Sequence, residues 1–403
     1  MAGSLTETPV YSADAGVHSA RVSLAGFTLT GLLISFVGAA LPVWGFHLNS
    51  EFIVAGTYFL LLNAGFLVAA RAGQGIMHHR GVGFTASLGA FLASGAFLYL
   101  AAMSSPFSPW WRFPGLFWLG FSAGLLFVGL LAGVTPLYDV GRAATLNLVG
   151  MTFGIGCVLM SLLVAGTYYV YDVRGILFLV AVIPAIFGVL FMRMRAPEPP
   201  PPHPEPELLH RQLHSVAAIL FALLLFFQFG NEWAIAGWLP LFLIQRLGIS
   251  PENSLFMLAL YWAALLLGRI VAQGLLSGMR RRRILLISAT AALLGCVLLA
   301  ATDNTGGALA GIVCTGAGFA AIFPLTMESI GRRFPYYHPL TYSGIFSFAF
   351  TGGMLAPWSL GFMAQWWGVG AMIIVPMLGT GMVFLLLGLI VIEGRLSQGQ
   401  AVK

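Results

Sequence analysis

One acidic residue, Glu232, lies deep inside a long apolar stretch of the chain. The chain has 13 Asp and Glu residues, and the others fall in tails, loops, a central linker or the ends of apolar runs. An ionised side chain near the centre of a hydrocarbon layer costs about 2.5–3.5 kcal/mol. Such a residue is expected to face a cavity or a partner, and a buried carboxyl can carry a proton near neutral pH. We therefore interpret Glu232 as a solute-binding and proton-coupling group; the alternative is a protonated acid that only joins helices.

Polar and aromatic neighbours surround this acid in the sequence. Gln228 precedes Glu232 by four positions, and Asn231 follows Gln228 by three, so we expect the three to share one helical face. Their amide and carboxyl groups can hydrogen-bond the hydroxyls of a solute, and Trp233 offers a ring for stacking. These four residues form the core of the predicted binding site.

Three residues of other apolar runs could face the same cavity, namely Asn63, Asn147 and Tyr261. An asparagine in such a run can equally hold two helices together. A tyrosine near the start of an apolar run is often an anchor at a membrane surface. We include all three among the predicted solute contacts.

The composition indicates which solvent surrounds these residues. Hydrophobic residues make up 59% of the 403-residue chain and charged residues only 8%, with mean hydropathy +0.92. Soluble domains carry about 25% charged residues. The basic residues, which bring the net charge to +6, lie in short loops rather than in one stripe, so nucleic-acid binding is not expected. The surrounding solvent must largely be lipid.

About 20 apolar residues cross a bilayer as a helix. This length predicts an all-α integral membrane protein with twelve transmembrane helices, near 22–45, 52–71, 82–103, 113–137, 144–168, 174–193, 215–242, 253–276, 284–301, 306–327, 338–363 and 369–392. Most Lys and Arg residues fall on one side of these spans, which predicts both termini in the cytoplasm. A bacterial inner membrane is the expected location.

A proline-rich segment divides the predicted spans into two sets of six. Residues 196–207 hold seven prolines and three glutamates and are expected to form an extended spacer. We divide the chain into a tail (1–20), a first six-helix bundle (21–195), a cytoplasmic linker (196–213), a second bundle (214–393) and a second tail (394–403).

Similar sequence features recur in the two halves, as expected of a duplicated six-helix unit. In each half an arginine closes the second span and an acid closes the fourth. This pattern predicts two ion pairs, Arg71–Asp139 and Arg269–Glu328, that brace the cytoplasmic face. The alternative is that these charges separately reach the membrane surface.

Four stretches resemble the major facilitator superfamily, and within it the fucose permease-like group of fucose, galactose and glucose:proton symporters. They are Leu146-Asn147 with Phe153-Gly154-Ile155-Gly156, Gly230-Asn231-Glu232 with Trp238-Leu239, Trp262 with Gly268-Arg269, and Gly316-Ala317-Gly318 with Phe323-Pro324. The resemblance implies two pseudo-symmetric bundles that move around a central site. The first and fourth spans contain no acid, so that group's route of proton coupling is not carried over.

We expect a secondary active transporter that moves a small polar solute, most simply a sugar or polyol, by proton symport with alternating access. The alternative is a proton-coupled efflux antiporter or an uptake system for another organic solute, such as an amphipathic compound or an organic acid. The histidines show no metal-ligand spacing and there is no phosphate-binding loop, so we expect no metal, no cofactor and no enzyme activity. A monomer in the lipid bilayer, with the solute and protons as partners, is expected.

A substitution of Glu232 tests its predicted role as the proton carrier. Glu232→Gln keeps the shape of the side chain but cannot release a proton, so proton-driven accumulation should be abolished while solute exchange largely persists. Uptake and counterflow in proteoliposomes measure the two activities. Wild-type pH dependence in this variant would exclude proton coupling through Glu232.

Overall fold

The computed structural model describes residues 13–49, 51–104, 106–194, 215–276, 278–334 and 345–400, with the side chains of 13–18, 136, 138–143, 346–347 and 396–400 left out of the description. This part of the chain is helical and has no strand. The first half contains α1 (Ala13–Val43), α2 (Phe52–Arg80), α3 (Val82–Ala102), α4 (Phe113–Gly133), α5 (Tyr138–Thr167) and α6 (Val173–Met192). The second half contains α8 (Val216–Leu247), α9 (Pro251–Leu275), α10 (Arg281–Ala301), α11 (Thr305–Ala320), α12 (Ile322–Arg333), α13 (Ile345–Trp367) and α14 (Ile374–Gln400). Short 3-10 turns, η1 (Pro109–Arg112), η2 (Thr135–Leu137) and η4 (Val369–Ile373), precede α4, α5 and α14.

Polar side chains start several of these helices. The side chains of Asp172, Ser215, Ser250 and Asn304 each accept a hydrogen bond from a backbone N–H three residues later, at the beginning of α6, α8, α9 and α11. Such caps satisfy N–H groups that the first turn leaves unpaired. Gly248 ends α8 in the left-handed conformation, with φ 65°.

Membrane-spanning length is confirmed for nearly all the predicted helices. In the described residues, eleven helical stretches are long and apolar enough to cross a membrane, and α11 with α12 counts as one of them. α13, with 23 residues, also has sufficient length. The start of its predicted span, 338–344, and the linker, 196–213, lie outside the described residues, so the domain boundaries remain predictions.

Several helices extend beyond the membrane spans predicted for them. α2 continues to Arg80 instead of ending near 71, α5 begins at Tyr138, and α14 runs to Gln400, past the predicted end at 392. The predicted single span 306–327 is two helices that meet at Ala321. Pro324 has no N–H to donate to the preceding turn, which explains a break just before it.

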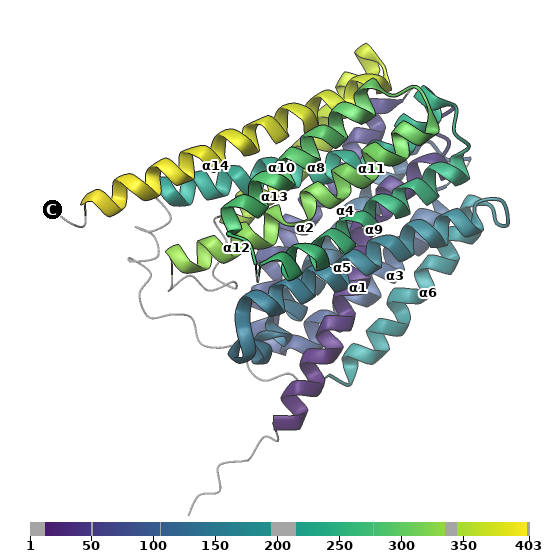
Figure 1. Ribbon diagram of the computed structural model, residues 1–403. Coiled ribbons are helices and arrows are strands. Elements are labelled where there is room, and N and C mark those ends of the chain that lie inside the picture. The colour runs from purple at the N-terminus through teal and green to yellow at the C-terminus, as the bar shows by residue number, and fades with distance from the viewer. Residues whose placement is uncertain are drawn as a thin grey trace, which may run out of the picture.

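The same packing pattern occurs in both halves. α1 packs on α5 as α8 packs on α13, and α2 packs on α4 as α9 packs on α11. Across the halves, α2 contacts α13 and α5 contacts α9. Because α9 and α13 are the second-half counterparts of α2 and α5, these two contacts are equivalent. The predicted pair of pseudo-symmetric bundles is thereby confirmed. The helices run side by side, and the first turns of α1 and the last turns of α14 project from the same end of the bundle, here called the terminal end (Figure 1).

The end opposite the termini is closed across the halves. Gly38 of α1 lies so close to α8 that a Cβ would meet the Ala236 carbonyl at 2.5 Å. The Phe52 N–H at the start of α2 donates to Oε1 of Gln365 near the end of α13, at 3.2 Å. Trp238 is fully buried in this region and donates from Nε1 to the Pro357 carbonyl at 2.9 Å. The halves therefore meet tightly at this end.

A glycine contact between α2 and α4 provides a test of the packing. A Cβ at Gly120 would overlap the backbone carbonyl of Leu62, whereas one at the exposed Gly95 of α3 meets no heavy atom within 4 Å. Gly120→Leu should therefore lower the stability of the purified protein by about 3 kcal/mol, because backbone must move to admit the side chain. Thermal unfolding in detergent measures this. Gly95→Leu, the control, should melt close to wild type, and equal losses in both variants would contradict the packing described.

Candidate functional site

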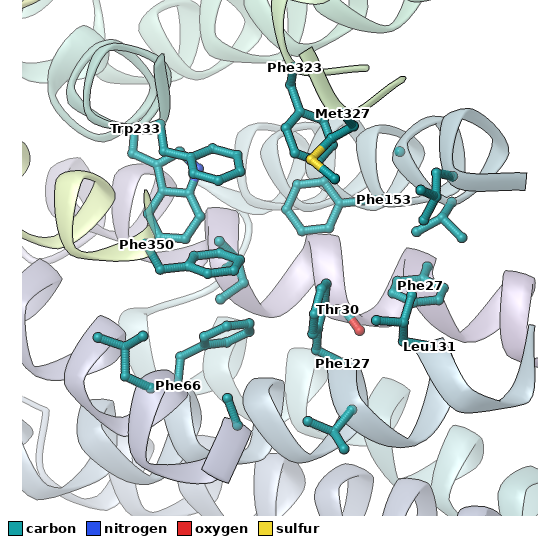
Figure 2. Close-up of a pocket in the computed structure, with 18 of the residues that line it drawn as sticks. Phe27, Thr30, Phe66, Phe127, Leu131, Phe153, Trp233, Phe323, Met327 and Phe350 are labelled. Atoms are coloured by element: carbon teal, nitrogen blue, oxygen red, sulfur yellow. The ribbon is translucent and has the colours of Figure 1, made fainter. Parts of the chain in front are cut away.

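A cavity of about 190 Å³ lies between the two halves. Its walls come from α1, α2, α4 and α5 on one side and α8, α9, α12 and α13 on the other. Eight of the lining residues are aromatic: Phe27, Phe66, Phe127, Phe153, Phe229, Trp233, Phe323 and Phe350. All of these except Phe229 are labelled in Figure 2, where they gather around the cavity. The cavity is therefore mainly a surface of rings.

Phe350 of α13 connects the rings of the two halves. Its ring stacks on Phe229 with centroids 5.2 Å apart and an interplanar angle of 14°. It lies 4.7 Å from Phe66 and 5.9 Å from Trp233. Ring pairs at such spacings attract each other beyond their apolar contact. Phe350 thus joins α2 of one half to α8 of the other at the cavity wall.

Five lining residues are polar or charged: Thr30, Arg71, Gln74, Glu232 and Arg269. Thr30 is buried, and its hydroxyl has no hydrogen-bond partner. Arg71, an exposed residue of α2, also lines the cavity, so the cavity wall continues along α2 toward the terminal end. With two arginines and one glutamate, the charged lining favours an anion when all three are ionised.

Glu232 is 4% exposed and is held by residues of the second half. Nε2 of Gln228 donates to its Oε1 at 2.7 Å and also points to the Phe319 carbonyl at 3.3 Å. The Tyr261 hydroxyl donates to the backbone carbonyl of Glu232 at 3.2 Å. Gln228 and Tyr261 therefore position Glu232, and neither of them lines the cavity itself.

Arg269 of α9 faces the same cavity and is 7% exposed. Its Nη1 donates to the Gly150 carbonyl of α5 at 2.6 Å, which ties the two halves together. Its Nε has no partner. Arg269 and Glu232 lie close enough to interact electrostatically, and the ion pairs within 4 Å in the described part of the chain do not include them. A small polar group could therefore bind between them.

Besides Gln228 and Tyr261, three further predicted contacts are not in the cavity wall. Asn231 donates to Thr380 Oγ1 of α14 at 3.4 Å, because it is turned about 100° around α8 from Glu232. Asn63 is 1% exposed and donates to the Phe59 carbonyl in its own helix at 2.8 Å. Asn147 donates to Gln273 Oε1 of α9 and so connects the halves. Asn147 thus joins two helices, the alternative considered for it from the sequence, whereas Asn63 bonds within its own helix.

The predicted Arg269–Glu328 ion pair is not formed. Glu328 binds Arg281 at 2.7 Å and Arg332 at 3.4 Å, at the terminal end of α12. Arg269 is buried beside α5 instead, because its long side chain reaches the Gly150 carbonyl. Arg71 lines the cavity, and the side chain of its predicted partner Asp139 lies outside the described residues.

Sequence reasoning located Glu232 and Trp233 in the predicted site and missed most of the aromatic wall. The chain has 32 phenylalanines, and nothing in their spacing separates the cavity-lining ones from those that face lipid or pack between helices. Arg269 was recognised as a charged residue at a helix end, but its place in the cavity depends on how α9 packs against α5.

Comparison with known proteins shows the family. The model of the Major Facilitator Superfamily matches residues 130–357 and 221–400, more than half of the chain. An uncharacterized MFS-type transporter of Yersinia pestis is 25% identical over 142 residues, which span 35% of this chain and only 37% of that relative.

Solved structures share the fold at low identity. A crystal structure of a mutant of the nucleoside transporter NupG has a TM-score of 0.70 and 14% identity, covering 94% of this chain and 99% of that one. FucP in the outward conformation has a TM-score of 0.63 and 16% identity over 93% of this chain and 99% of its own. A second structure, of a FucP mutant described as the Escherichia coli fucose:proton symporter, gives the same values. This chain is therefore a multi-pass integral membrane protein of the major facilitator superfamily, and so a transporter rather than an enzyme.

Proposed function

We propose that this protein is a proton-coupled secondary transporter of a small organic acid with an aromatic or similarly flat apolar body. The observation that carries the proposal is the joint presence of Arg269, Glu232 and eight aromatic residues around one cavity between the halves. This substrate class is the organic-solute alternative considered from the sequence, and it replaces the sugar or polyol as the leading hypothesis.

The rings support an apolar solute body. Sites for small molecules are mostly apolar with a few placed polar groups, and flat solutes stack on aromatic side chains. Gln228 and Asn231, which were expected to bind hydroxyls, do not line the cavity. Gln228 donates to Glu232 and to the Phe319 carbonyl, and Asn231 donates to Thr380. A sugar would find few of the donors and acceptors that its hydroxyl groups need.

Arg269 supports an acidic group on the solute. A guanidinium binds a carboxylate through several N–H groups, and one of those of Arg269, at Nε, has no partner. Among the lining residues that the structure describes, Glu232 is the one acid, against two arginines. A carboxylate placed near Arg269 would therefore enter a site whose net charge is positive.

Glu232 supports coupling to protons. An ionised Glu232 repels a carboxylate bound at Arg269, and protonation removes that repulsion. Proton binding and solute binding then favour each other, and by linkage each strengthens the other by the same factor. One proton and one anionic solute would cross the membrane together and carry no net charge. Accumulation would therefore depend on the pH gradient and not on the membrane potential.

The arrangement of the helices supports loading from the cytoplasm. The end opposite the termini is closed by α1 against α8 and α2 against α13, and the distribution of basic residues favours termini in the cytoplasm. Opening at the far end, with closure at the terminal end, would expose the same cavity to the outside. This movement is alternating access between the two halves.

Proton symport of a sugar or polyol remains the second candidate. The similarity in fold to the fucose:proton symporter favours it, although similarity in fold alone does not identify the solute. In that case transport of a neutral solute with a proton carries charge, and the membrane potential alone would drive it.

A panel of matched compounds tests the substrate class. Indole-3-acetate and benzoate should raise the Tm of the purified protein, and their amides should bind at least about tenfold more weakly, because a neutral amide loses the charge-assisted contact with Arg269. Thermal shift across a concentration series gives the affinities. Stabilisation by fucose or galactose without any effect of the acids would support the second candidate and reject the first.

Substitution of Arg269 tests the proposed anion site. Arg269→Gln should weaken binding of the acids by about tenfold or more and leave binding of the amides within about threefold, since a neutral amide makes no charge-assisted contact with the guanidinium. Arg269→Lys, which keeps the charge, should retain part of the affinity. Arg246→Gln is the matched control, because Arg246 pairs with Asp303 at 3.5 Å and does not line the cavity. Equal losses for acids and amides would show that Arg269 only holds α9 to α5.

A further inference from the structure

A second cavity, of about 320 Å³, lies between α8, α10, α12 and α14 at the terminal end of the bundle. It shares no lining residue with the central cavity. Its walls are mainly apolar, with Phe221 and Leu224 from α8, Leu285 from α10, and Phe384 and Leu387 from α14. We call this space the terminal groove.

The groove opens toward the side of the bundle. Gly388 of α14 lines it and is exposed, and a Cβ there would meet no heavy atom within 4 Å. Leu286 of α10, another lining residue, is 39% exposed. Apolar side chains on the outside of membrane helices face lipid tails. The groove is therefore accessible to the bilayer rather than to the central solute path.

Two arginines stand at one edge of this apolar space. Arg281 and Arg282 belong to the first turn of α10 and line the groove. Arg281 is partly neutralised by Glu328, whose Oε1 lies 2.7 Å from its Nη2, but its Nε has no partner. Arg282 is exposed and takes part in none of the ion pairs found in the described ranges. The edge therefore keeps a net positive charge.

A buried hydroxyl between these features has no partner. Thr326 of α12 is 2% exposed and lines the groove, and its Oγ1 makes no hydrogen bond. Ser329, one turn later, is satisfied by the Leu325 carbonyl at 2.8 Å. A buried hydroxyl that makes no hydrogen bond is energetically unfavourable. Thr326 thus indicates a missing polar group inside a largely apolar groove.

We propose that the terminal groove binds an anionic phospholipid of the cytoplasmic leaflet. The phosphate lies against Arg281 and Arg282, Thr326 hydrogen-bonds an oxygen of the glycerol-ester region, and an acyl chain covers Phe384 and Leu387. Basic pockets between membrane helices on the cytoplasmic side bind anionic headgroups in this manner. A free phosphate would satisfy the arginines but leave the apolar walls uncovered, so the lipid fits the groove better.

The binding is tested on the full-length protein in detergent by native mass spectrometry with three probes. Dioleoyl-phosphatidylglycerol should give one saturable bound lipid and raise the Tm. Dioleoyl-phosphatidylcholine has the same chains and no net charge and should bind at least about fivefold more weakly. Inorganic phosphate should have no effect. Equal binding of the two lipids, or equal protection by phosphate alone, would overturn the proposal.

Variants locate the bound lipid. Arg282→Gln should weaken phosphatidylglycerol binding by about fivefold, the value of one arginine near an anionic headgroup. Gly388→Leu should abolish the saturable site by filling the groove, and it improves helix propensity at an open position. Arg283→Gln, in the same turn but outside the groove, and Gly95→Leu, on α3, are the matched controls. If the four variants bind phosphatidylglycerol alike, the lipid is not in the terminal groove.

Discussion

Glu232 and Arg269 face one aromatic-lined cavity from α8 and α9 without forming a close ion pair. Each charge near the centre of a bilayer costs about 2.5–3.5 kcal/mol on insertion scales. The surrounding contacts reduce this cost only in part, since Gln228 holds the carboxyl and the Gly150 carbonyl holds the guanidinium. Under the proposed function, protonation of Glu232 or binding of an anionic solute near Arg269 would reduce the energetic cost that remains. The rest of the structure serves to keep these two groups apart from lipid and from each other.

The duplicated architecture provides this separation. α5–α9 and α2–α13 are equivalent contacts between the halves, and α1 also packs on α8, so residues of both halves form the cavity wall. Arg269 touches the first half although it belongs to the second. Any movement of the halves that breaks its bond to Gly150 changes the electrostatic surroundings of Glu232. Under the proposed function, protonation and helix movement would be linked through this one residue, as a coupled transporter requires.

The fold was largely predictable from the sequence, and the site only in part. Apolar runs of helix length identify the spans, and the free-energy cost of a buried charge identifies Glu232. Neither step requires knowledge of how the helices pack. Asn231 does not face the cavity as expected, because residue spacing shows which residues share a helical face but not which neighbouring helix that face contacts. Arg269 was assigned to Glu328 by analogy between the halves, whereas the structure gives Glu328 to Arg281. The aromatic wall depends on contacts such as Phe66–Phe350, which join residues far apart in the chain.

The most direct measurement is the uptake of protons when an acid binds. Purified protein in weakly buffered detergent solution is mixed with a saturating aromatic carboxylate, and a pH indicator records the protons taken from solution at a pH where Glu232 is ionised. We expect uptake approaching one proton per bound acid for the wild type, and none for Glu232→Gln, with binding retained in both. Binding without proton uptake in the wild type, or the same uptake in Glu232→Gln, would contradict coupling between Glu232 and an anion at Arg269.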